Sequence, residues 1–323
     1  MRRVAVLTSG GDSPGMNAAI RAVVRSGDQA GVATVGVERG FAGLIDGAFS
    51  PLDARAVSGI LHQAGTILGT ARSPRFRTTE GRREALKHLD LAEVDGLVVI
   101  GGDGTMRGAD ALSREGDVPV VGIPGTTDND LAGSDVTLGF DTAVNTALES
   151  IDRVRDTATT HGRVFFVEVL GRHSGWLSLA SGLAGGATHV VTPEHGVDVH
   201  AIRTAIRRGL GIGKRFCLVV VAEGDHAGNA YDIAERVCEG LPDVEAEVAA
   251  LGHVLRGGVP SMRDRLLGSV LGDAALSALL DGEDRIMVGE RCGALVRTPL
   301  SRAWTEHRPL PESLLALLDR LAR

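Results

Sequence analysis

The sequence is poor in the residues that mark several common protein classes. Aromatic residues make up 3% of its 323 residues, so base-stacking surfaces for single-stranded nucleic acid are not expected. Its 34 basic and 41 acidic residues leave a net charge of −7, which disfavours nucleic acids and anionic membranes as partners. No run approaches the roughly 20 apolar residues of a membrane-spanning helix. The sequence therefore predicts neither a nucleic-acid-binding protein nor a membrane protein.

Cysteine is also scarce. Cys217, Cys238 and Cys292 show no CxxC spacing and no neighbouring pair of histidines, so neither a disulfide framework nor a zinc site is expected. The apolar run Val4–Leu7 near the N-terminus is too short for the core of a signal peptide. We expect a cytoplasmic protein with reduced thiols.

Hydrophobic residues, at 43%, are sufficient for a sizeable core, and the length is typical of about two domains. Short apolar runs alternate along the chain with amphipathic helical patterns. Continuous apolar strands alternating with helices are typical of parallel sheets covered on both faces. The sequence thus predicts an α/β protein of two domains, with a boundary near Gly139. The expected strands are 4–8, 33–38, 96–100, 118–123, 164–170, 190–193 and 215–222, and the expected helices are 17–25, 106–114, 143–156, 175–184, 199–210, 264–280 and 310–321.

A glycine-rich segment, TSGGDSPGMN, follows the first predicted strand, where parallel sheets bind ligands. Gly10, Gly11 and Gly15 allow main-chain N–H groups to approach an anion, and the following helix adds the positive end of its dipole. The segment is neither a GxGxxG nor a Walker A motif. Asp12 and Ser13 are also ordinary helix caps, so a phosphate loop and a plain tight turn both explain it.

Two further polar segments follow predicted strands. In Ile100–Gly108 (IGGDGTMRG), glycines beside Asp103 suit nucleotide phosphates with Mg²⁺, which predicts a phosphotransferase; the alternative is a turn with a capping carboxylate. In Pro124–Asp130 (PGTTDND), Asp128 and Asp130 can divide two roles, as a base for an acceptor hydroxyl and in the Mg²⁺ environment. A solvated acidic loop is the alternative reading of this segment.

In their order along the chain these segments resemble motifs of the phosphofructokinase family. The ordered set is TSGGDSPGMNAAIR, GTARSPRFR, IGGDGT, PGTTDND, GFDTA, VEVLGRHSGW, AEG and LGHVLRGG, and it spans nearly the whole sequence. The resemblance, to short bacterial members, implies a nucleotide-binding domain (1–139 plus 253–303) and a sugar-phosphate-binding domain (140–252 plus 304–323), with the active site in the cleft between them. It implies transfer of a phosphoryl group from ATP, with Mg²⁺, to the 1-hydroxyl of fructose 6-phosphate in glycolysis. Fructose 1,6-bisphosphate is the product, and a homotetramer is the expected assembly.

The resemblance also implies roles for individual residues. Asp128 is the general base, and it acts with Thr126, Arg72 and Arg172. The implied nucleotide-site residues are Gly11, Arg72, Arg77, Arg82, Gly102, Asp103, Gly104, Thr105 and Gly108, with Phe41 near the adenine. The implied substrate-site residues are Thr126, Asp128, Asp130, Arg163, Leu170, Gly171, Arg172, Glu223, His253 and Arg256, of which Arg163 is offered across a subunit interface. Asp103 and Asp130 are the Mg²⁺-linked carboxylates.

The donor can be read from two positions. Pyrophosphate-dependent relatives usually carry Asp instead of Gly104 and Lys instead of Gly125. A carboxylate at position 104 would crowd and repel the α-phosphate of ATP, and a lysine at position 125 would bind the end of pyrophosphate. Glycine at both positions therefore favours ATP.

The chain departs from the family pattern at the acceptor site and the effector site. Glu247 stands where an arginine usually clamps the 6-phosphate, Leu255 replaces a glutamine, and Arg263 replaces an aromatic residue. Three explanations remain open: Arg263 supplies the missing charge, the loop shifts locally, or the acceptor is another sugar, sugar phosphate or polyol.

The effector positions are matched in part. Arg21, Arg25, Arg155 and Lys214 match basic residues that bind effectors, but Thr188 replaces a metal-linked glutamate. Control by ADP and phosphoenolpyruvate is therefore not expected. A non-catalytic sensor is a further alternative, against which the intact Asp103, Asp128, Asp130, Arg72 and Arg172 argue.

Overall fold

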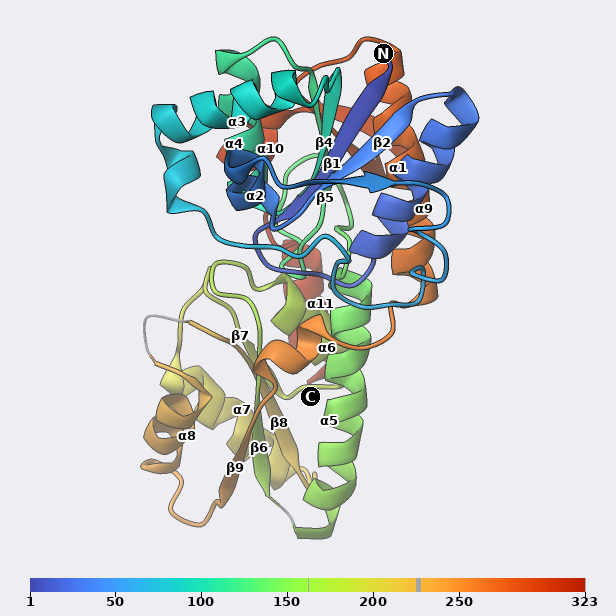
Figure 1. Ribbon diagram of the computed structural model, residues 1–323. Coiled ribbons are helices and arrows are strands. Elements are labelled where there is room, and N and C mark those ends of the chain that lie inside the picture. The colour runs from blue at the N-terminus through green and yellow to red at the C-terminus, as the bar shows by residue number, and fades with distance from the viewer. Residues whose placement is uncertain (162, 225–227, 323) are drawn as a thin grey trace. The chain divides into compact units, whose positions relative to one another are not determined.

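The computed structural model describes residues 1–161, 163–224 and 228–322 (Figure 1). The chain folds into two compact units that are both discontinuous in sequence. Unit 1 comprises Met1–Thr127, Leu131–Thr142 and Arg256–Arg308, and unit 2 comprises Asp128–Asp130, Ala143–Leu255 and Pro309–Arg323.

Unit 1 is built on a seven-stranded sheet in the order β11-β10-β5-β4-β1-β2-β3. The five central strands are parallel, and β3 and β11 pair antiparallel at the two edges. The predicted mostly parallel sheet is therefore confirmed. The strands are β1 (Arg3–Ser9), β2 (Ala33–Val37), β3 (Phe49–Leu52), β4 (Gly96–Gly101), β5 (Val120–Pro124), β10 (Ile286–Arg291) and β11 (Ala294–Pro299).

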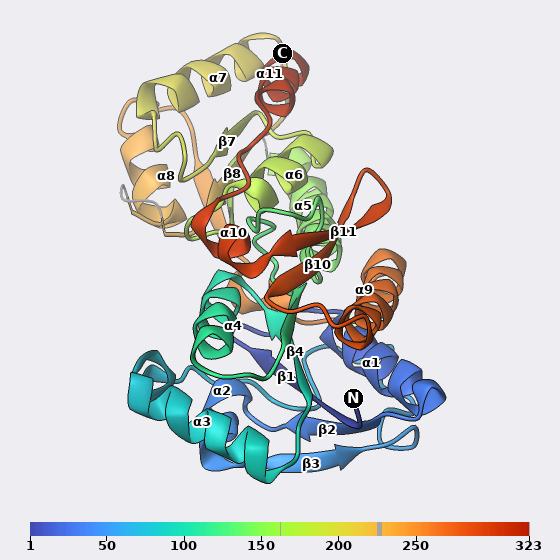
Figure 2. The same ribbon diagram turned by 90° about the horizontal axis from the view of Figure 1, so that it is seen from above.

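Helices cover both faces of this sheet because the side chains of each strand alternate between the faces. Val4 and Val6 of β1 pack with α1 (Met16–Ala30) and α9 (Met262–Leu280), which lie side by side in Figure 2. Ala5 and Leu7 point to the opposite face. That face is covered by α2 (Gly40–Asp46), α3 (Thr79–Leu91), α4 (Asp103–Glu115) and α10 (Leu300–Thr305), and η1 (Pro74–Arg77) precedes α3.

Two glycines of α9 allow it to approach α1 closely. A Cβ atom on Gly272 would lie 2.5 Å from the carbonyl oxygen of Ala19, and one on Gly268 would lie 2.8 Å from that of Gly15. Larger side chains at either position would push the two helices apart.

Unit 2 contains a four-stranded parallel sheet in the order β7-β8-β6-β9. Its strands are β6 (Val164–Val169), β7 (His189–Val191), β8 (Cys217–Ala222) and β9 (Ala246–Ala250). Phe166, Val219 and Val221 form a core with α7 (Val199–Gly211) and α8 (Ala230–Cys238) on one face. Helix α6 (Trp176–Ala184) packs on β8, and α5 (Phe140–His161) begins in unit 1. The remaining helices are α11 (Glu312–Leu321) and the short η2 (Gly252–Arg256).

No helix in the described part of the chain combines the length and the apolar character needed to cross a membrane.

Candidate functional site

The three polar segments that follow predicted strands begin at one edge of the unit 1 sheet. They follow β1, β4 and β5, which are neighbouring parallel strands whose ends are level, with Ser9 opposite Gly101 and Gly101 opposite Pro124. The Thr105 hydroxyl donates to the carbonyl oxygen of Ser9 at 3.0 Å, and the Gly125 N–H donates to that of Gly101 at 2.9 Å. Segments far apart in the sequence thus form one surface, at the carboxyl ends of strands where α/β sheets bind ligands.

The first of these segments is held in place by side chains from elsewhere in unit 1. The Thr70 hydroxyl donates to the Gly10 carbonyl oxygen at 2.6 Å, and Nη1 of Arg256 donates to the Asp12 carbonyl oxygen at 3.0 Å. A Cβ atom on Gly11 would lie 2.6 Å from that Nη1 atom. Arg256, a predicted substrate residue, therefore packs directly against the glycine-rich loop.

Asp103 begins α4 and is exposed, with Oδ1 accepting from the Gly104 N–H at 2.5 Å. A Cβ atom on Gly104 would have no neighbour within 4 Å among the described atoms, so the surface beside the carboxylate is open. Mg²⁺ in phosphotransferases is commonly bound by one or two carboxylates, with water and phosphate oxygens as its other ligands. Asp103 fits this role. The described residues contain no cluster of three or more His, Cys, Asp or Glu side chains suited to a metal.

Phe41, implied near the adenine, is a core residue. Its ring stacks on Phe76 with 3.9 Å between centroids and 12° between planes, and both side chains are buried. A Cβ atom on Gly108 would lie 3.0 Å from Phe41 and 3.2 Å from Phe76. Glycine is therefore required at position 108, because a larger side chain would collide with this aromatic pair. The pair packs in the core under α4, the helix that begins at Asp103.

The three arginines of the predicted nucleotide site differ in exposure. Arg72 and Arg77 are exposed, whereas the Arg82 side chain is 13% exposed. The Arg82 guanidinium forms two bonds to Glu115, of 2.6 and 2.9 Å, and donates to the Phe76 and Arg77 carbonyl oxygens. The bond to Glu115 raises the pKa of Arg82. These contacts favour a structural role for Arg82 and leave Arg72 and Arg77 as the arginines exposed to a ligand.

The second group of predicted residues lies at the carboxyl edge of the unit 2 sheet. Leu170–Arg172 follow β6, Glu223 follows β8, and His253 lies in η2 after β9, and these three strands are neighbours. The Glu223 N–H donates to the Val169 carbonyl oxygen at 2.8 Å. A Cβ atom on Gly224 would lie 3.2 Å from Cγ of Arg172, so the loops after β6 and β8 are in contact. Unit 2 thus brings Arg172, Glu223 and His253 to one edge.

The PGTTDND segment is divided between the units. Thr126 belongs to unit 1, where its carbonyl oxygen accepts from the Thr137 hydroxyl at 2.6 Å. Asp128 belongs to unit 2, where its carbonyl oxygen accepts from the Ser174 hydroxyl at 2.7 Å. Asn129, at φ 53°, turns the chain between the half-buried Asp128 and Asp130. Of the predicted Mg²⁺-linked carboxylates, Asp103 is thus in unit 1 and Asp130 in unit 2.

Arg163 and Glu247 lie at the opposite, amino edge of the unit 2 sheet. Arg163 precedes β6, and Glu247 is opposite Phe165 on the neighbouring strand β9. The Arg163 guanidinium forms ion pairs with Glu245, at 3.0 Å, and with Glu247. A strand rises about 3.3 Å per residue, so most of β9 separates Glu247 from His253. The structure therefore does not bring Arg163 together with the other substrate-site residues of its own chain.

The other two residues that differ from the family pattern, Leu255 and Arg263, lie in different surroundings. Leu255 is fully buried, so it occupies a core position. Arg263 lies on the exposed side of α9, with Nη2 4.0 Å from a Glu290 oxygen. Arg263 belongs to unit 1 and Glu247 to unit 2.

Three of the residues at effector positions, Arg155, Thr188 and Lys214, have partners within unit 2. The Thr188 hydroxyl accepts from the Leu218 N–H at 3.3 Å. Nζ of Lys214 donates to the Ala322 carbonyl oxygen at 2.8 Å, and the Arg155 guanidinium donates to that of Gly185. These contacts are the ones that an effector would have to displace.

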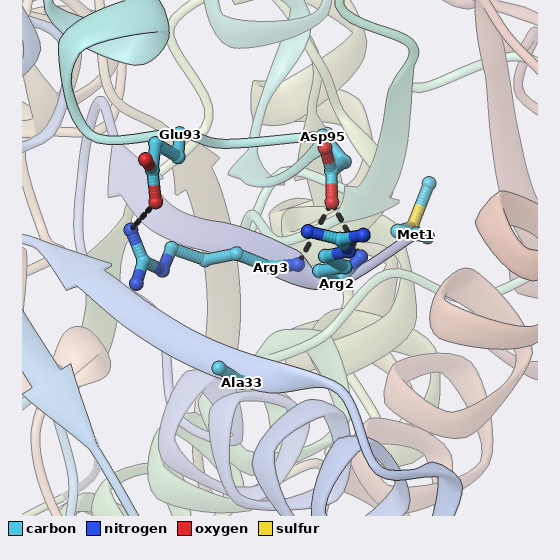
Figure 3. A pocket seen from close by; sticks show the side chains of 6 residues that line it. All are labelled: Met1, Arg2, Arg3, Ala33, Glu93 and Asp95. Carbon is cyan, nitrogen blue, oxygen red and sulfur yellow. Dashed lines mark hydrogen bonds and ion pairs between the residues drawn. The ribbon is translucent and has the colours of Figure 1, made fainter.

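A pocket of about 420 Å³ opens at the amino ends of β1, β2 and β4 (Figure 3). Arg3 pairs with Glu93 at 3.6 Å, and Asp95 accepts from the Arg2 and Arg3 N–H groups. Because it lies at the amino ends of the strands, the wrong end for an α/β ligand site, it is not the candidate site. Its lining residues are Met1, Arg2, Arg3, Ala33, Glu93 and Asp95.

Comparison with known families agrees with the geometry. Residues 3–279 match the family model described as phosphofructokinase. The chain belongs to the phosphofructokinase family. Its relatives include ATP-dependent 6-phosphofructokinase 1 of Thermus thermophilus, 52% identical over 322 residues that cover 100% of both chains. The ATP-dependent 6-phosphofructokinase of Cytophaga hutchinsonii is 46% identical and covers 99% of this chain and 98% of its own.

Solved structures support the family fold. The phosphofructokinase of Saccharomyces cerevisiae has a TM-score of 0.88 and 34% identity, and the match covers all of this chain and 47% of that one. A pyrophosphate-dependent phosphofructokinase of Marinobacter aquaeolei, at 22% identity and a TM-score of 0.86 over 97% of this chain and 86% of its own, shows the same fold. The family resemblance and the predicted α/β fold, with mostly parallel sheets flanked by helices, are thus confirmed.

Proposed function

We propose that the chain is an ATP-dependent 6-phosphofructokinase that converts fructose 6-phosphate to fructose 1,6-bisphosphate. The observation that carries the proposal is the similarity, at about half of all positions over the full chain, to enzymes named for this activity. The polar loops at the carboxyl edges of the two sheets support it. The cytoplasm is the proposed location and glycolysis the proposed pathway.

The donor phosphates would lie on the loops of unit 1. The main-chain N–H group of Gly11 and the N-terminal turn of α4 suit phosphate oxygens, and the exposed Arg72 and Arg77 add positive charge. The open surface at Gly104 has room for the α-phosphate, which favours ATP over pyrophosphate. Phosphoryl transfer depends mainly on positioning and on charge stabilisation, and this surface offers both.

Asp103 and Asp130 are the residues that would hold Mg²⁺. When bound, the ion neutralises negative charge on the donor phosphates. The exposure of Asp103 and the half-buried position of Asp130 are compatible with a site completed by water and phosphate.

The acceptor would meet Asp128 as its general base. Asp128 would take the proton of the sugar 1-hydroxyl, while Arg172 stabilises charge on the transferring group and Thr126 orients it. Leu170, Gly171, Glu223, His253 and Arg256 complete the proposed sugar site. Arg163 would serve a neighbouring subunit of a homotetramer, since its own chain holds it at the far edge of the sheet.

The test is an assay of the purified enzyme with MgATP and a panel of acceptors: fructose 6-phosphate, other sugar phosphates, free sugars and polyols. Fructose 6-phosphate should have the highest kcat/KM by a wide margin. Asp128→Asn should lower turnover by about 10²–10⁴-fold, the usual contribution of a positioned base. Asp243→Asn, at an exposed aspartate before β9, is the matched control and should leave turnover unchanged.

Absence of turnover at millimolar fructose 6-phosphate would overturn the proposal, and a better acceptor in the panel would replace the substrate. Turnover that is lost in Asp128→Asn would exclude a non-catalytic sensor. Near-normal turnover in that variant would remove Asp128 from the assigned role.

A further inference from the structure

Asp264, on the first turn of α9, is fully buried and bonds to the start of α5. Its carboxylate accepts from the Gly139 N–H at 2.9 Å, from the Thr142 N–H at 2.8 Å and from the Thr142 hydroxyl. The same hydroxyl accepts from the Ser261 N–H at 2.9 Å, so the first turns of α5 and α9 are interlocked. Three donors offset part of the cost of desolvating this carboxylate, and burial still raises the pKa of Asp264.

This cluster is packed against the end of the glycine-rich loop. Gly15 has φ +99°, and a Cβ atom on it would lie 3.1 Å from the Asp264 carbonyl oxygen and 3.3 Å from its Cβ. Gly139 has φ +97°, and a Cβ atom there would lie 2.6 Å from Cβ of Ser13 and 3.0 Å from Cδ of Pro14. Residues 13–15 are therefore enclosed by Gly139 on one side and by Asp264 on the other.

The hydrogen bond from the Gly139 N–H to the Asp264 carboxylate fixes the distance between the two residues that enclose residues 13–15. Loss of this bond removes one of the contacts that fix Gly139 against residues 13 and 14. The loop is short and its other end is held at Gly10 by Thr70, so a shift at residues 13–15 is transmitted to the N–H groups between them.

We propose that Asp264 is a positioning residue that holds the loop of residues 10–15 in the geometry required by the donor phosphates. The inference rests on the proposed function. Misplacement of a reacting group by about 1 Å can lower a rate by about 10²-fold. Asp264 touches neither substrate in this arrangement and acts through Gly139 and Gly15.

Asp264→Asn tests the proposal with almost no change of shape. Asparagine has one acceptor oxygen, so its NH₂ group would face either the Gly139 N–H or the Thr142 N–H, and at least one bond is lost. We expect kcat to fall about 10–100-fold. KM for fructose 6-phosphate should change less than kcat, because most of the proposed acceptor residues belong to unit 2, although Arg256 donates to this loop. Thr142→Ser, which keeps the hydroxyl, should have normal turnover, and Thr142→Val should show a smaller loss than Asp264→Asn.

Asp284→Asn is the matched control. The Asp284 carboxylate also accepts from a hydroxyl and a main-chain N–H, those of Ser113 and Val120, both at 2.9 Å, but at the amino end of β5. Both Asn variants should lower the melting temperature. A merely structural role for Asp264 predicts equal kcat per folded molecule in the two variants, and that result would overturn the proposal.

Hydrogen exchange gives a readout that does not depend on activity. Amides of residues 10–16 should exchange faster in Asp264→Asn than in the unmodified enzyme and be unchanged in Asp284→Asn; equal exchange in all three would overturn the proposal. If the unmodified enzyme fails to use fructose 6-phosphate, the proposed function is wrong, while the exchange rates still decide whether Asp264 holds the loop. If Asp264→Asn does not fold, Thr142→Val is tested by the same two measurements.

Discussion

Gly104 and Gly125 follow neighbouring strands, yet their surroundings differ. A Cβ atom on Gly125 would lie 3.1 Å from Ile100 and 3.2 Å from Met16, whereas one on Gly104 would meet no atom of the described chain within 4 Å. Position 104 can therefore accept a side chain without repacking of its neighbours. A substitution there tests the effect of charge on donor binding separately from any effect on packing.

We expect Gly104→Asp to fold normally and to raise KM for ATP by about 10–100-fold, since about 1.4 kcal/mol of repulsion corresponds to each tenfold change in affinity. The carboxylate would lie on the first turn of α4, where negative charge is tolerated by the helix dipole. Gly104→Asn, which has the same shape without the charge, is the control. The measurements are KM for ATP and the melting temperature; equal KM values in the two variants would show that charge at this position does not determine the donor.

Glu247 is 48% exposed and paired with Arg163, so its replacement by arginine leaves two adjacent guanidinium groups and removes an ion pair worth about 0–1 kcal/mol. If the amino edge of the unit 2 sheet, where Glu247 lies, binds the sugar phosphate in an assembled enzyme, Glu247→Arg should lower KM for fructose 6-phosphate. The decrease should be several-fold to about 100-fold, as expected for a new charge-assisted hydrogen bond. Turnover should change little, because this end of the sugar is remote from the transferred group.

Glu247→Gln removes the negative charge without adding a positive one, and it should lower KM by a smaller factor. Steady-state kinetics on the acceptor panel is the measurement. If Glu247 instead binds a hydroxyl or an amine of a different acceptor, both variants should lose activity on that compound. KM values unchanged for every acceptor would place Glu247 outside any acceptor site.

Residue types and spacing alone located the glycine-rich loops of unit 1 as candidate phosphate sites, because each loop follows a strongly apolar strand and carries its own glycines. The partners of Arg82 and Glu247 could not be predicted in this way. Glu115 and Arg163 are distant in sequence from them, and the pairing depends on how the elements pack. The positioning role of Asp264 could not be predicted, because a serine followed three residues later by an aspartate is the sequence pattern of an ordinary helix N-terminus.

At the scale of elements, the contact between α1 and α9 depends on small residues. Gly272→Ala would place a methyl group 2.5 Å from the Ala19 carbonyl oxygen, so we expect it to lower the free energy of unfolding by about 1–3 kcal/mol. Gly211→Ala, at the end of α7, is the control: an added Cβ finds no described atom within 4 Å, and the change should be neutral or stabilising by up to about 1 kcal/mol. Denaturant unfolding measures both. Equal effects would indicate that the helices shift apart without cost.

Most central strands of the two sheets were predictable because they are continuous apolar runs, fully buried as in β4 and β8. The central strand β10 was missed, because its apolar run is short and is followed by Glu290 and Arg291. The edge strands β3, β9 and β11 were missed. They are partly exposed, and they include Pro51, Glu247 and Arg297, so they lack the apolar run that marks a buried strand. Helix α8 was also missed, although its capping box of Asn229 and Asp232 is a local signal that could have located it.

At the scale of the whole molecule, acid stability should depend in part on Asp95. Hydrogen bonds from the Arg2 and Arg3 N–H groups lower the pKa of this carboxyl below its ordinary value. Its contribution is therefore present above the unfolded pKa of about 3.9 and is lost as the pH falls through the lower folded value.

Asp95→Asn should reduce the free energy of unfolding at pH 7 by about 1 kcal/mol or less, since the site is exposed. The difference from the unmodified chain should shrink below about pH 4. Denaturant unfolding at pH 7 and at pH 3 measures it. A difference that stays constant over this range would show that the carboxylate charge does not contribute.

The sheet order of unit 1 also has a consequence for biosynthesis. Strand β5 pairs on one side with β4, but its other neighbour, β10, is translated only after the whole sheet of unit 2. Until the ribosome has passed residue 291, a nascent chain exposes the main-chain donors and acceptors along one side of β5, and an open strand edge of this kind is a template for aggregation. The nascent polypeptide should therefore depend on chaperones late into its synthesis.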